Sequence, residues 1–456
     1  MIMRGIELLY FKLSYKLKEI KDNLIEKHLK NLLIKPSQNN LDSPINNKLP
    51  SNPTKEFLEW FVGFTDAEGC FSIRIENRKY LRLIFTIELH KDDVSVLYKI
   101  KDALGVGRVL INKNKDSALF FISKFEDINL VLIPLFKNYP LQTTKYLDFL
   151  SFVDAASIIL NSKNLNNKHL SPLDREKLIN LKQSINTKRL INEKEYKLLS
   201  EKVYISKWWL LGFIEGEGTF GYKHLVPYFQ IAQNQKNLFV LKAIEAYLLK
   251  EFYLIDSKNK ELEFKYNLNK LTGVYSMTLE KVDDNFYYVI PFFESLTFLS
   301  RKSVDYEWWV ISVFIHKLGY FYLPEGKQIA LQISSSTNKN RYTTQVDLKK
   351  IGLPSIESIF NLFKQTPPFD IYRDCSHFDL VREFTIAKGG RKGFTVYIYE
   401  CNTISDLKEV KGSPFSTYGD GHEVLGLRRG SRVIGRYIDT GKLYKDKYRF
   451  SSISLK

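Results

Sequence analysis

The sequence contains an internal repeat, and a duplicated unit restricts the possible folds more strongly than any single element does. The segment 60–69 (WFVGFTDAEG) matches the segment 209–218 (WLLGFIEGEG), and a strand-like segment follows each of them. In both, an aromatic residue and two apolar residues precede Gly-Phe, an acid and Glu-Gly. The final acids, Glu68 and Glu217, are 149 residues apart.

Two further pairs of segments repeat downstream in the same order. TTKYLDF around Lys145 matches SRKSVDY around Lys302 at an offset of 157 residues. The NTKR sequence at 186–189 matches NKNR at 338–341 at an offset of 152. Because three pairs keep their order at a nearly constant offset, they indicate the duplication of a unit of roughly 150 residues.

Hydrophobic periodicity predicts the order α-β-β-α-β-β-α in each unit, with an antiparallel sheet, so the fold class is α+β. Apolar and polar residues alternate over 71–76 and 81–88, as they do in half-buried strands. A helix is expected to end before Gly105, and a further helix near 136–153 closes the unit.

The ends of the first helix of each unit also have sequence signals. Asn52-Pro53 and Ser206 are expected to cap these helices at their N-termini, and Gly69 and Gly218 to end them. Gly63 and Gly212 each precede another small residue by four positions, which places two small residues on one helical face. We therefore expect the two helices to pack closely against each other.

The amino-acid composition restricts the kind of binding partner that the protein can have. The chain has 456 residues, 44% of them hydrophobic and 14% aromatic, which is enough to bury cores for two or three domains. Lys and Arg number 68 against 51 Asp and Glu, which gives a formal charge of +17. Such a chain favours a polyanionic partner, nucleic acid before an anionic membrane. Three cysteines without a CxxC motif argue against a disulfide framework or a zinc site, and no sequence segment predicts a membrane span.

Composition and pattern also suggest domain boundaries. Residues 1–50 form a basic appendage whose acidic residues argue against a transit peptide. The remaining segments are expected to be a first repeat at 51–155, a helical connector at 156–200, a second repeat at 201–343, a linker at 344–393 and a C-terminal module at 394–456. The abundance of Lys, Asn, Ile, Tyr and Phe is typical of A/T-rich coding sequences, which points weakly to an organelle genome.

If the two halves pack about a pseudo-two-fold axis, Glu68 and Glu217 converge at the ends of their helices. Two nearby carboxylates repel each other, and the negative end of each helix dipole adds to the repulsion. Bound divalent cations resolve this conflict, and oxygen ligands suit Mg²⁺. Such a site can hydrolyse phosphodiesters, and one acid in each half suits a substrate with two strands. The alternative is that both motifs are solvated helix ends, which a repeat in register disfavours.

The segments 61–69 and 210–218 resemble the paired motifs of the single-chain LAGLIDADG homing endonucleases, of the kind encoded in organellar group I introns. The resemblance extends over about 53–343 and includes YPLQTTKYLDF, FLSRKSVDY, HLSPLDREK and YLPEGKQIA. It implies two antiparallel sheets that form a saddle over DNA, with the motif helices between the halves. It also implies double-strand cleavage of a long intronless target with Mg²⁺ (or Mn²⁺), by a monomer in the mitochondrial matrix.

The resemblance also implies roles for individual residues. The metal site would comprise Glu68, Glu217, Gly69 and Gly218. The acids two residues earlier, Asp66 and Glu215, match helix-end residues and are assigned no catalytic role. Lys145 and Lys302 resemble active-site lysines that contact water or the scissile phosphate, although either one alone could be a solvated helix-end lysine.

Gln233 in FQIAQ matches a polar residue that positions the catalytic water. Its first-half counterpart in FTIEL is Leu89, followed by His90. This departure leaves the first half without a defined water-positioning group and suggests that the two strands are cut at unequal rates.

The face of each sheet opposite the core is expected to contact DNA, because a two-stranded ribbon fits the major groove. The candidate contact residues are Ser72, Arg74, Glu76, Arg82, Thr86 and Glu88 in the first half, and Lys223, Tyr228 and Gln230 in the second. A solvated sheet face would have a similar mixture of polar residues. Most of the affinity should come from other Lys and Arg residues on phosphates, and should fall with salt.

The C-terminal segment is predicted to form a strand, two short helices around a Gly-containing turn, and a returning strand. Residues 389–456 contain 13 Lys and Arg against 7 Asp and Glu. The segment resembles the type 1 nuclease-associated modular domain found on the tails of intron endonucleases, with a helix-turn-helix-like module. The expected DNA contacts are Arg428, Arg429, Arg432 and Arg436. A basic but purely structural tail is the alternative.

Three functions remain open on the sequence alone. The first is a site-specific double-strand DNA endonuclease. The second is a maturase that binds its own group I intron RNA and assists splicing, with or without cleavage. The third, a DNA-binding protein without chemistry, leaves the paired acids Glu68 and Glu217 unexplained. Fold alone does not distinguish these functions.

Overall fold

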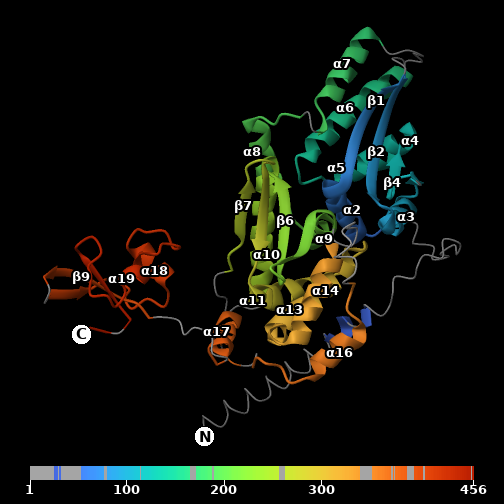
Figure 1. Cartoon of the computed structure of the whole chain (residues 1–456). Helices are drawn as coiled ribbons and strands as arrows, with labels where there is room; N and C mark the ends of the chain where they lie inside the picture. Colours follow the sequence, from blue (N-terminus) through green and yellow to red (C-terminus); the bar gives the residue numbers. More distant parts are fainter. Residues whose placement is uncertain are drawn as a thin grey trace, which may run out of the picture. The chain divides into compact units, whose positions relative to one another are not determined.

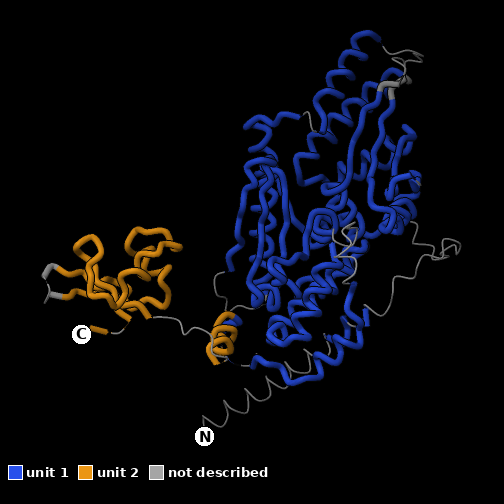
Figure 2. The backbone as a smooth tube through the Cα atoms, viewed as in Figure 1, with its two compact units in different colours: residues 1–377 blue, residues 378–456 orange. Residues whose placement is uncertain are grey.

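The computed structural model describes the chain in two compact units, residues 1–377 and 378–456 (Figure 2). The described residues are 25–28, 30–31, 53–76, 80–112, 114–164, 171–186, 189–255, 262–338, 352–370, 373, 375–387, 395–403, 406–452 and 454–455. None of the helices within these ranges is long and apolar enough to span a membrane.

The first repeat forms one antiparallel sheet with strand order β1-β2-β4-β3. Its elements are α2 (Lys55–Glu68), β1 (Gly69–Glu76), β2 (Tyr80–His90), α3 (Val94–Leu104), β3 (Arg108–Asn112), β4 (Ser117–Ile122), α4 (Phe125–Asp127), α5 (Ile133–Asn138) and α6 (Lys145–Asn164). Phe71, Phe85 and Phe120 of this sheet are fully buried under its helices.

The second repeat has the same topology, with strand order β5-β6-β8-β7. Its elements are α9 (Lys207–Glu217), β5 (Gly218–Lys223), β6 (Val226–Asn234), α10 (Leu238–Ile255), β7 (Lys265–Asn269), β8 (Val274–Leu279), α11 (Val282–Asp284), α12 (Ile290–Glu294), α13 (Lys302–Lys317) and α14 (Pro324–Ser336). Figure 1 shows the two sheets on either side of the α2–α9 pair. The predicted α+β fold of two antiparallel repeats is confirmed.

The helix that closes each unit differs from the prediction. The expected single helix near 136–153 is divided into α5 and α6. Pro140 lies in the break, where it has no N–H to donate and disfavours a helical residue before it. Asp66 then accepts the free N–H groups of Gln142 (2.8 Å) and Thr143 (3.1 Å). In the second repeat α12 and α13 are divided in the same way.

The caps of the first helices were predicted in part. Ser206 caps α9 as expected, because its hydroxyl accepts the N–H of Trp209 at 3.2 Å. The cap of α2 is Thr54, whose hydroxyl accepts the N–H of Phe57 at 3.2 Å, so the assignment to Asn52-Pro53 was wrong.

Gly69 and Gly218 end their helices as predicted, but for a different physical reason. Both have extended backbones (φ −73° and −75°), so neither uses the left-handed conformation that favours glycine. A Cβ on Gly69 would lie 2.8 Å from the carbonyl oxygen of Thr65, and one on Gly218 would lie 2.7 Å from that of Ile214. The glycines are needed because a side chain at the start of either strand would collide with a main-chain carbonyl oxygen in the last turn of the helix before it.

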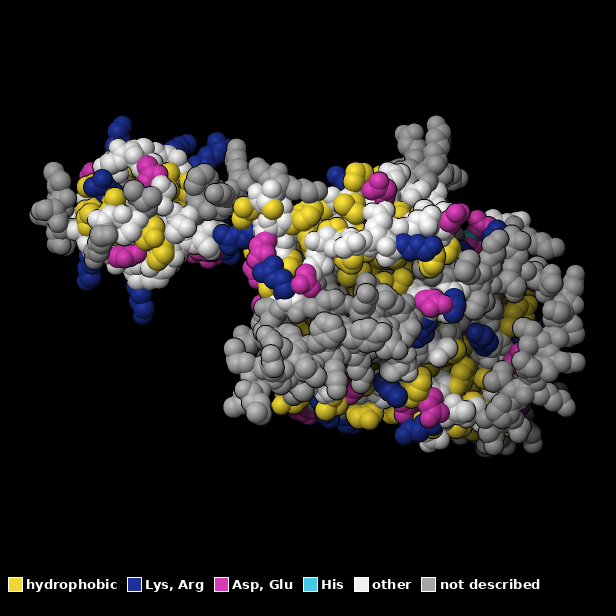
Figure 3. All heavy atoms as spheres, turned by 90° about the horizontal axis from the view of Figure 1, so that it is seen from below, with side chains coloured by type: hydrophobic (Ala, Val, Ile, Leu, Met, Phe, Trp, Pro, Cys, Tyr) yellow, Lys and Arg dark blue, Asp and Glu magenta, His cyan; other side chains and the backbone are white. Residues whose placement is uncertain are grey.

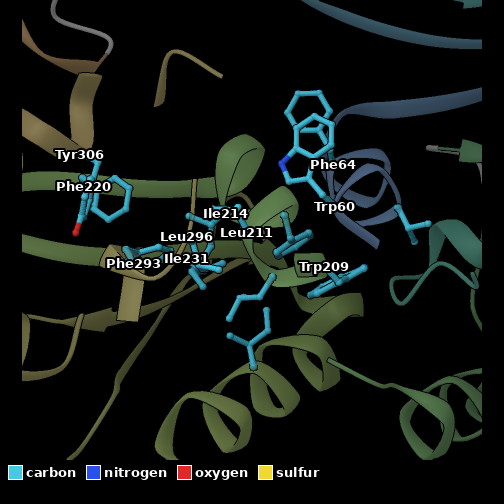
Figure 4. Packing of buried hydrophobic residues seen from close by; sticks show 14 of the residues in the cluster. Trp60, Phe64, Trp209, Leu211, Ile214, Phe220, Ile231, Phe293, Leu296 and Tyr306 are labelled. Carbon is cyan, nitrogen blue, oxygen red and sulfur yellow. The ribbon is translucent and has the colours of Figure 1, made fainter. Parts of the chain in front are cut away.

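The two motif helices touch through glycine, as the spacing predicted. A Cβ on Gly63 would lie 1.9 Å from the carbonyl oxygen of Trp209, and one on Gly212 would lie 2.0 Å from that of Trp60. Figure 4 shows the side chains packed around this contact, including Trp60 and Phe64 of α2 and Trp209 and Leu211 of α9. The interface between the repeats is therefore a backbone-to-backbone contact surrounded by buried aromatic rings.

Segments outside the repeats complete the first unit. The connector contains α7 (Pro172–Gln183) and α8 (Glu193–Lys202), and the expected linker 344–393 contains α16 (Ile356–Lys364). The other helix of that linker, α17 (His377–Ala387), belongs to the second unit from Phe378 onward. Ile359 and Leu362 of α16 are buried, and the Tyr320 hydroxyl donates to the carbonyl of Gln365 at 2.6 Å. Helix α16 therefore packs as part of the core of this unit.

Residues 25–28 of the N-terminal segment also contact the second repeat. His28 is fully buried between Glu294 of α12 and Glu307 of α13. Burial alone lowers the pKa of His28, but hydrogen bonds and charge from the two glutamates outweigh it and raise the pKa from 6.5 to about 8. Lys27 adds an ion pair with Glu294.

Replacement of Gly212 by Ala is expected to destabilise the first unit by about 3 kcal/mol or more, because the new methyl group meets backbone atoms of Trp60 rather than a movable side chain. Denaturant unfolding measures the effect. Ser157→Ala, at an exposed position of α6, is the control and should change the free energy of unfolding by less than about 0.5 kcal/mol. Equal effects of the two variants would contradict the close contact.

The environment of His28 predicts a pH-dependent contribution to stability. Because its pKa is higher in the folded state, the contribution is complete below 6.5 and is lost as the pH rises through about 8. The shift corresponds to about 2 kcal/mol. Unfolding measured between about pH 6 and pH 9 should show this loss in the wild type and not in His28→Gln. The same pH dependence in both proteins would contradict the assignment.

Candidate active site

Glu68 and Glu217 meet where the two motif helices end. A Cβ on Gly216 would lie 2.4 Å from the Cβ of Ala67 and 3.1 Å from Oε1 of Glu68. Burial raises the pKa of both glutamates, and the charge of Glu68 raises that of Glu217 further. Both line a cavity of 1190 Å³ whose lining includes residues of both sheets. The structure therefore brings the two predicted acids together at one point.

The two predicted lysines point back at the helix ends. Nζ of Lys145 donates to the carbonyl oxygens of Thr65 (2.8 Å) and Ala67 (3.3 Å), and Nζ of Lys302 donates to that of Gly218 (2.7 Å). Burial lowers the pKa of both lysines, and the charges of nearby acids oppose this shift. Each cation lies at the negative end of its own motif helix, where it is stabilised.

Gln233 lies on β6 with its side chain buried beside the acids. Its Oε1 accepts from Nδ2 of Asn237 at 2.8 Å, and hydrogen bonding by its side chain lowers the pKa of Glu217. At the matching position of the first repeat, Leu89 offers no polar group. His90, next to it, lines the cavity and accepts the N–H of Asp92 at 3.3 Å.

The chemistry of these donors fits a divalent cation. Two carboxylates are held against each other in a mostly buried site, and the lysines beside them donate to main-chain carbonyls. Within the described part of the chain, no group of three or more His, Cys, Asp or Glu residues is arranged to hold a metal. A cation here would therefore have two side-chain ligands and would complete its shell with water and phosphate oxygens, as Mg²⁺ does.

Asp66 and Glu215 have structural partners that the sequence did not reveal. Nε1 of Trp60 in the first repeat donates to Glu215 at 2.9 Å, and Nε1 of Trp209 in the second donates to Asp66 at 2.9 Å. Each acid also accepts main-chain N–H groups of the loop before its own active-site lysine. The repeated Trp–acid spacing of six residues was the available signal.

The third repeated pair of segments also acquires a structural role. Asn186 and Asn338 both have a left-handed backbone (φ 59° and 54°). Their Nδ2 atoms donate to the carbonyls of Phe71 (2.9 Å) and Phe220 (2.8 Å), the first buried aromatic of each sheet. Arg189 pairs with Asp148 at 2.7 Å, whereas Arg341 lies outside the described residues.

The predicted contact residues of the first sheet lie on the face away from the hydrophobic core. Arg74, Arg82 and Glu88 are exposed, and Ser72 and Thr86 are half-buried. Arg74 and Arg82 are directly opposite each other on β1 and β2, which concentrates positive charge at one place on the face. The side chain of Glu76 lies outside the described residues.

In the second sheet, Tyr228 lies over Gly221, because a Cβ on that glycine would be 2.5 Å from the tyrosine ring. Gln230 accepts from the hydroxyl of Thr278 at 3.3 Å, and Lys223 pairs with Glu280 at 3.0 Å. Lys223, Tyr228 and Gln230 line a second cavity of 540 Å³ with several residues on or directly after β7 and β8 that the sequence did not predict. The missed residues are Lys265, Asn267, Ser276, Thr278 and Glu280. The alternation in KYNLN and VYSMTL was the available signal.

Besides α17, the second unit contains a three-stranded sheet with strand order β10-β9-β11 and two short helices. Its elements are β9 (Tyr397–Thr403), β10 (Asp406–Glu409), α18 (Tyr418–Val424), α19 (Val433–Tyr437) and β11 (Tyr448–Ser451). Nε2 of His422 accepts the N–H of Ile434 at 3.1 Å, which joins the two helices. Lys and Arg side chains project from several sides of this unit (Figure 3).

All four predicted contact residues of this unit are exposed: Arg428, Arg429, Arg432 and Arg436. Arg429 is ion-paired with Asp420 and, at 3.8 Å, with Glu423. The other three are on the turn between the helices or on α19.

The fold and the paired acids define a class of two-repeat proteins with a carboxylate site at the repeat interface. A family model described as LAGLIDADG endonuclease matches the chain twice, at residues 61–156 and 210–313. A probable intron-encoded DNA endonuclease aI1 of Mycosarcoma maydis is 32% identical over 96 residues, which are 21% of this chain and 75% of that protein. The chain belongs to the LAGLIDADG endonuclease family.

Two further comparisons extend this result. The uncharacterized mitochondrial protein RF1 of Saccharomyces cerevisiae is 26% identical over 441 residues, which are 94% of this chain and 87% of that protein. The structure of I-SmaMI bound to uncleaved DNA target in the presence of calcium ions is similar with a TM-score of 0.50 and 22% identity. That match covers 62% of this chain and 98% of I-SmaMI and shows that the two proteins share the fold.

Proposed function

We propose that this chain is a site-specific endonuclease that cuts both strands of DNA with divalent metal ions held between Glu68 and Glu217. One observation carries the proposal: two half-buried carboxylates, one from each repeat, converge at the ends of helices that pack through glycine. A binding protein gains nothing from this electrostatic repulsion, whereas a metal-dependent nuclease needs it. Relatives named as intron-encoded endonucleases support the same activity.

The proposed metal is Mg²⁺ or Mn²⁺, because both prefer oxygen ligands and accept phosphate oxygens. When bound, such an ion activates water and stabilises the leaving oxygen in phosphodiester hydrolysis. Calcium ions accompany the DNA in the structure of I-SmaMI, which has the same fold. Glu68 and Glu217, with the main chain of Gly69 and Gly218, are the groups that would hold the metal. Lys145 and Lys302 stabilise charge on the phosphate, and Gln233 positions a water.

The proposed substrate is the intronless allele of the chain's own host gene, bound as a long duplex across both sheets. Because one chain supplies both repeats, we propose that it acts as a monomer. The mitochondrial relative in yeast supports a location in the mitochondrial matrix. Group I intron RNA is our second candidate partner, since the same basic surface can bind another polyanionic duplex.

Replacement of either acid tests the proposal. Glu68→Gln and Glu217→Gln keep side-chain size and hydrogen bonding but remove the charge that binds a cation, so each is expected to reduce double-strand cutting by at least about 10²-fold. The assay incubates the protein with Mg²⁺ and a duplex that carries the joined exons without the intron.

Asp66→Asn is the matched control, because Asp66 is a buried motif-helix acid that hydrogen-bonds a loop and a tryptophan. It should lower stability and leave cutting by the remaining folded protein within about tenfold of the wild type. Unimpaired cutting by both Gln variants would contradict the metal site. A wild type that assists splicing but never cuts would favour the maturase instead.

We further propose that the second unit binds DNA phosphates through Arg428, Arg432 and Arg436. Arg432→Ala with Arg436→Ala is expected to weaken binding and to reduce the slope of log affinity against log salt by about 2, since each phosphate contact contributes roughly 0.9. Lys411→Ala with Lys442→Ala, which removes the same charge from exposed positions outside the helices, is the control. Equal slopes for both double variants would contradict specific contacts at α19.

A further inference from the structure

A series of hydrogen bonds runs from one repeat to Gln233 of the other, whose side chain lowers the pKa of the active-site glutamate Glu217. The main-chain N–H of Thr144, next to Lys145, donates to Oδ1 of Asn237 at 2.9 Å. Nδ2 of Asn237 donates to Oε1 of Gln233 at 2.8 Å, and hydrogen bonding by the Gln233 side chain lowers the pKa of Glu217. Asn237 and Gln233 are both buried, so water does not easily replace these bonds.

The main-chain N–H of Thr144 fixes which groups donate and which accept along this series of hydrogen bonds. A main-chain N–H can only donate, so the atom of Asn237 that faces Thr144 is the amide oxygen. The amide nitrogen of Asn237 must then face Gln233, whose oxygen accepts from it. The remaining polar group of Gln233 is its NH₂, which is the group that a carboxylate such as Glu217 accepts. Asn237 thus determines which end of the Gln233 amide faces the site.

In the other half, the equivalent series of hydrogen bonds begins in the same way but does not continue to the next residue. Asp93 matches Asn237, and its Oδ1 accepts the main-chain N–H of Arg301 at 2.9 Å. Arg301 precedes Lys302 just as Thr144 precedes Lys145. However, a carboxylate has no N–H to donate, and the next position is Leu89, which has no polar group. Two substitutions, Asp93 for Asn237 and Leu89 for Gln233, therefore separate the interrupted series of hydrogen bonds from the continuous one.

We infer that Asn237 is a positioning residue that orients Gln233 toward Glu217 and ties this orientation to the Lys145 loop of the opposite repeat. The inference rests on the proposed function. The two half-sites are then built differently. In the Glu217 half, the hydrogen bonds from Thr144 through Asn237 to Gln233, here called the relay, cross the interface between the repeats. In the Glu68 half, only the bond from Arg301 to Asp93, here called the anchor, holds the lysine loop. Cutting of one strand therefore depends on Asn237, and cutting of the other does not.

The test measures the cutting rate of each strand separately on a duplex labelled on both strands. Gln233→Leu, which copies Leu89, identifies the dependent strand as the one that it slows. Asn237→Ala and Asn237→Asp should slow that same strand by about 10-fold to 100-fold, as expected for loss of a group that orients an active-site ligand, and should leave nicked duplex as the product. Asn237→Asp keeps the acceptor for Thr144 but lacks the donor for Gln233. If Asn237 only held the Thr144 loop in place, this variant would cut both strands at the wild-type rate.

A double-mutant cycle separates the relay from independent effects. Once Gln233 is Leu, Asn237→Ala should slow the dependent strand by less than about twofold more, because the relay has already been broken. Additive effects of the two substitutions would overturn the inference, and so would equal slowing of both strands by Asn237→Ala.

Ser157→Ala, at an exposed position of α6, is the control. It should change neither strand by more than about threefold. Thermal unfolding and DNA affinity measured without metal should be close to the wild type for Asn237→Asp, as readouts independent of cleavage. A wild type that cuts neither strand would contradict the proposed function, whereas a cutting wild type with normal Asn237→Asp would contradict this inference alone.

Discussion

The contact between α2 and α9 is the constraint on which the rest of the structure depends. Helix axes can approach this closely only where glycine replaces a side chain, and Gly63 and Gly212 each face a main-chain carbonyl of the other helix. The same approach brings Ala67 against Gly216 and so sets the separation of Glu68 and Glu217. A bulkier residue would move both sheets and both acids apart, because each sheet begins at the residue after its glutamate.

Each repeat is completed by side chains of the other. Trp60 and Trp209 donate across the interface to Glu215 and Asp66, and these acids hold the loops that precede Lys302 and Lys145. Because these acids are buried, loss of one partner leaves polar groups without compensation, which costs far more than an exposed hydrogen bond. The active-site lysines are thus placed by the interface as much as by their own helices.

The sequence was sufficient for the parts of the structure that depend on local periodicity or on the repeat. The two antiparallel sheets, the glycine contact and the convergence of Glu68 and Glu217 follow from residue spacing and are found as predicted. The break before α6 was missed, although Pro140 signalled it, because the apolar pattern continues through the break. The cap at Thr54 was missed because Asn52 and Thr54 have similar capping preferences.

The remaining errors concern contacts between residues that are distant in the sequence. No local pattern predicts that a tryptophan will donate to an acid 155 residues away, or that Asn237 will accept from Thr144. Such bonds become visible only after the interface has been built, since both partners look like ordinary polar or aromatic residues on their own elements. The repeat gave an indirect signal, because a bond in one half predicts its counterpart in the other.

The counterpart of a hydrogen bond is missing where the two repeats have diverged, and the missing bonds distinguish the two half-sites. A duplicated unit begins with identical half-sites, so a difference such as Leu89 against Gln233, or Asp93 against Asn237, changes one half alone. Both differences lie along the same hydrogen-bond path, and the first half lacks the links beyond Asp93 while the bond from Arg301 to Asp93 is kept. The bond that holds the lysine loop is therefore common to both halves, and the hydrogen bonds through Asn237 to Gln233 are present in one half.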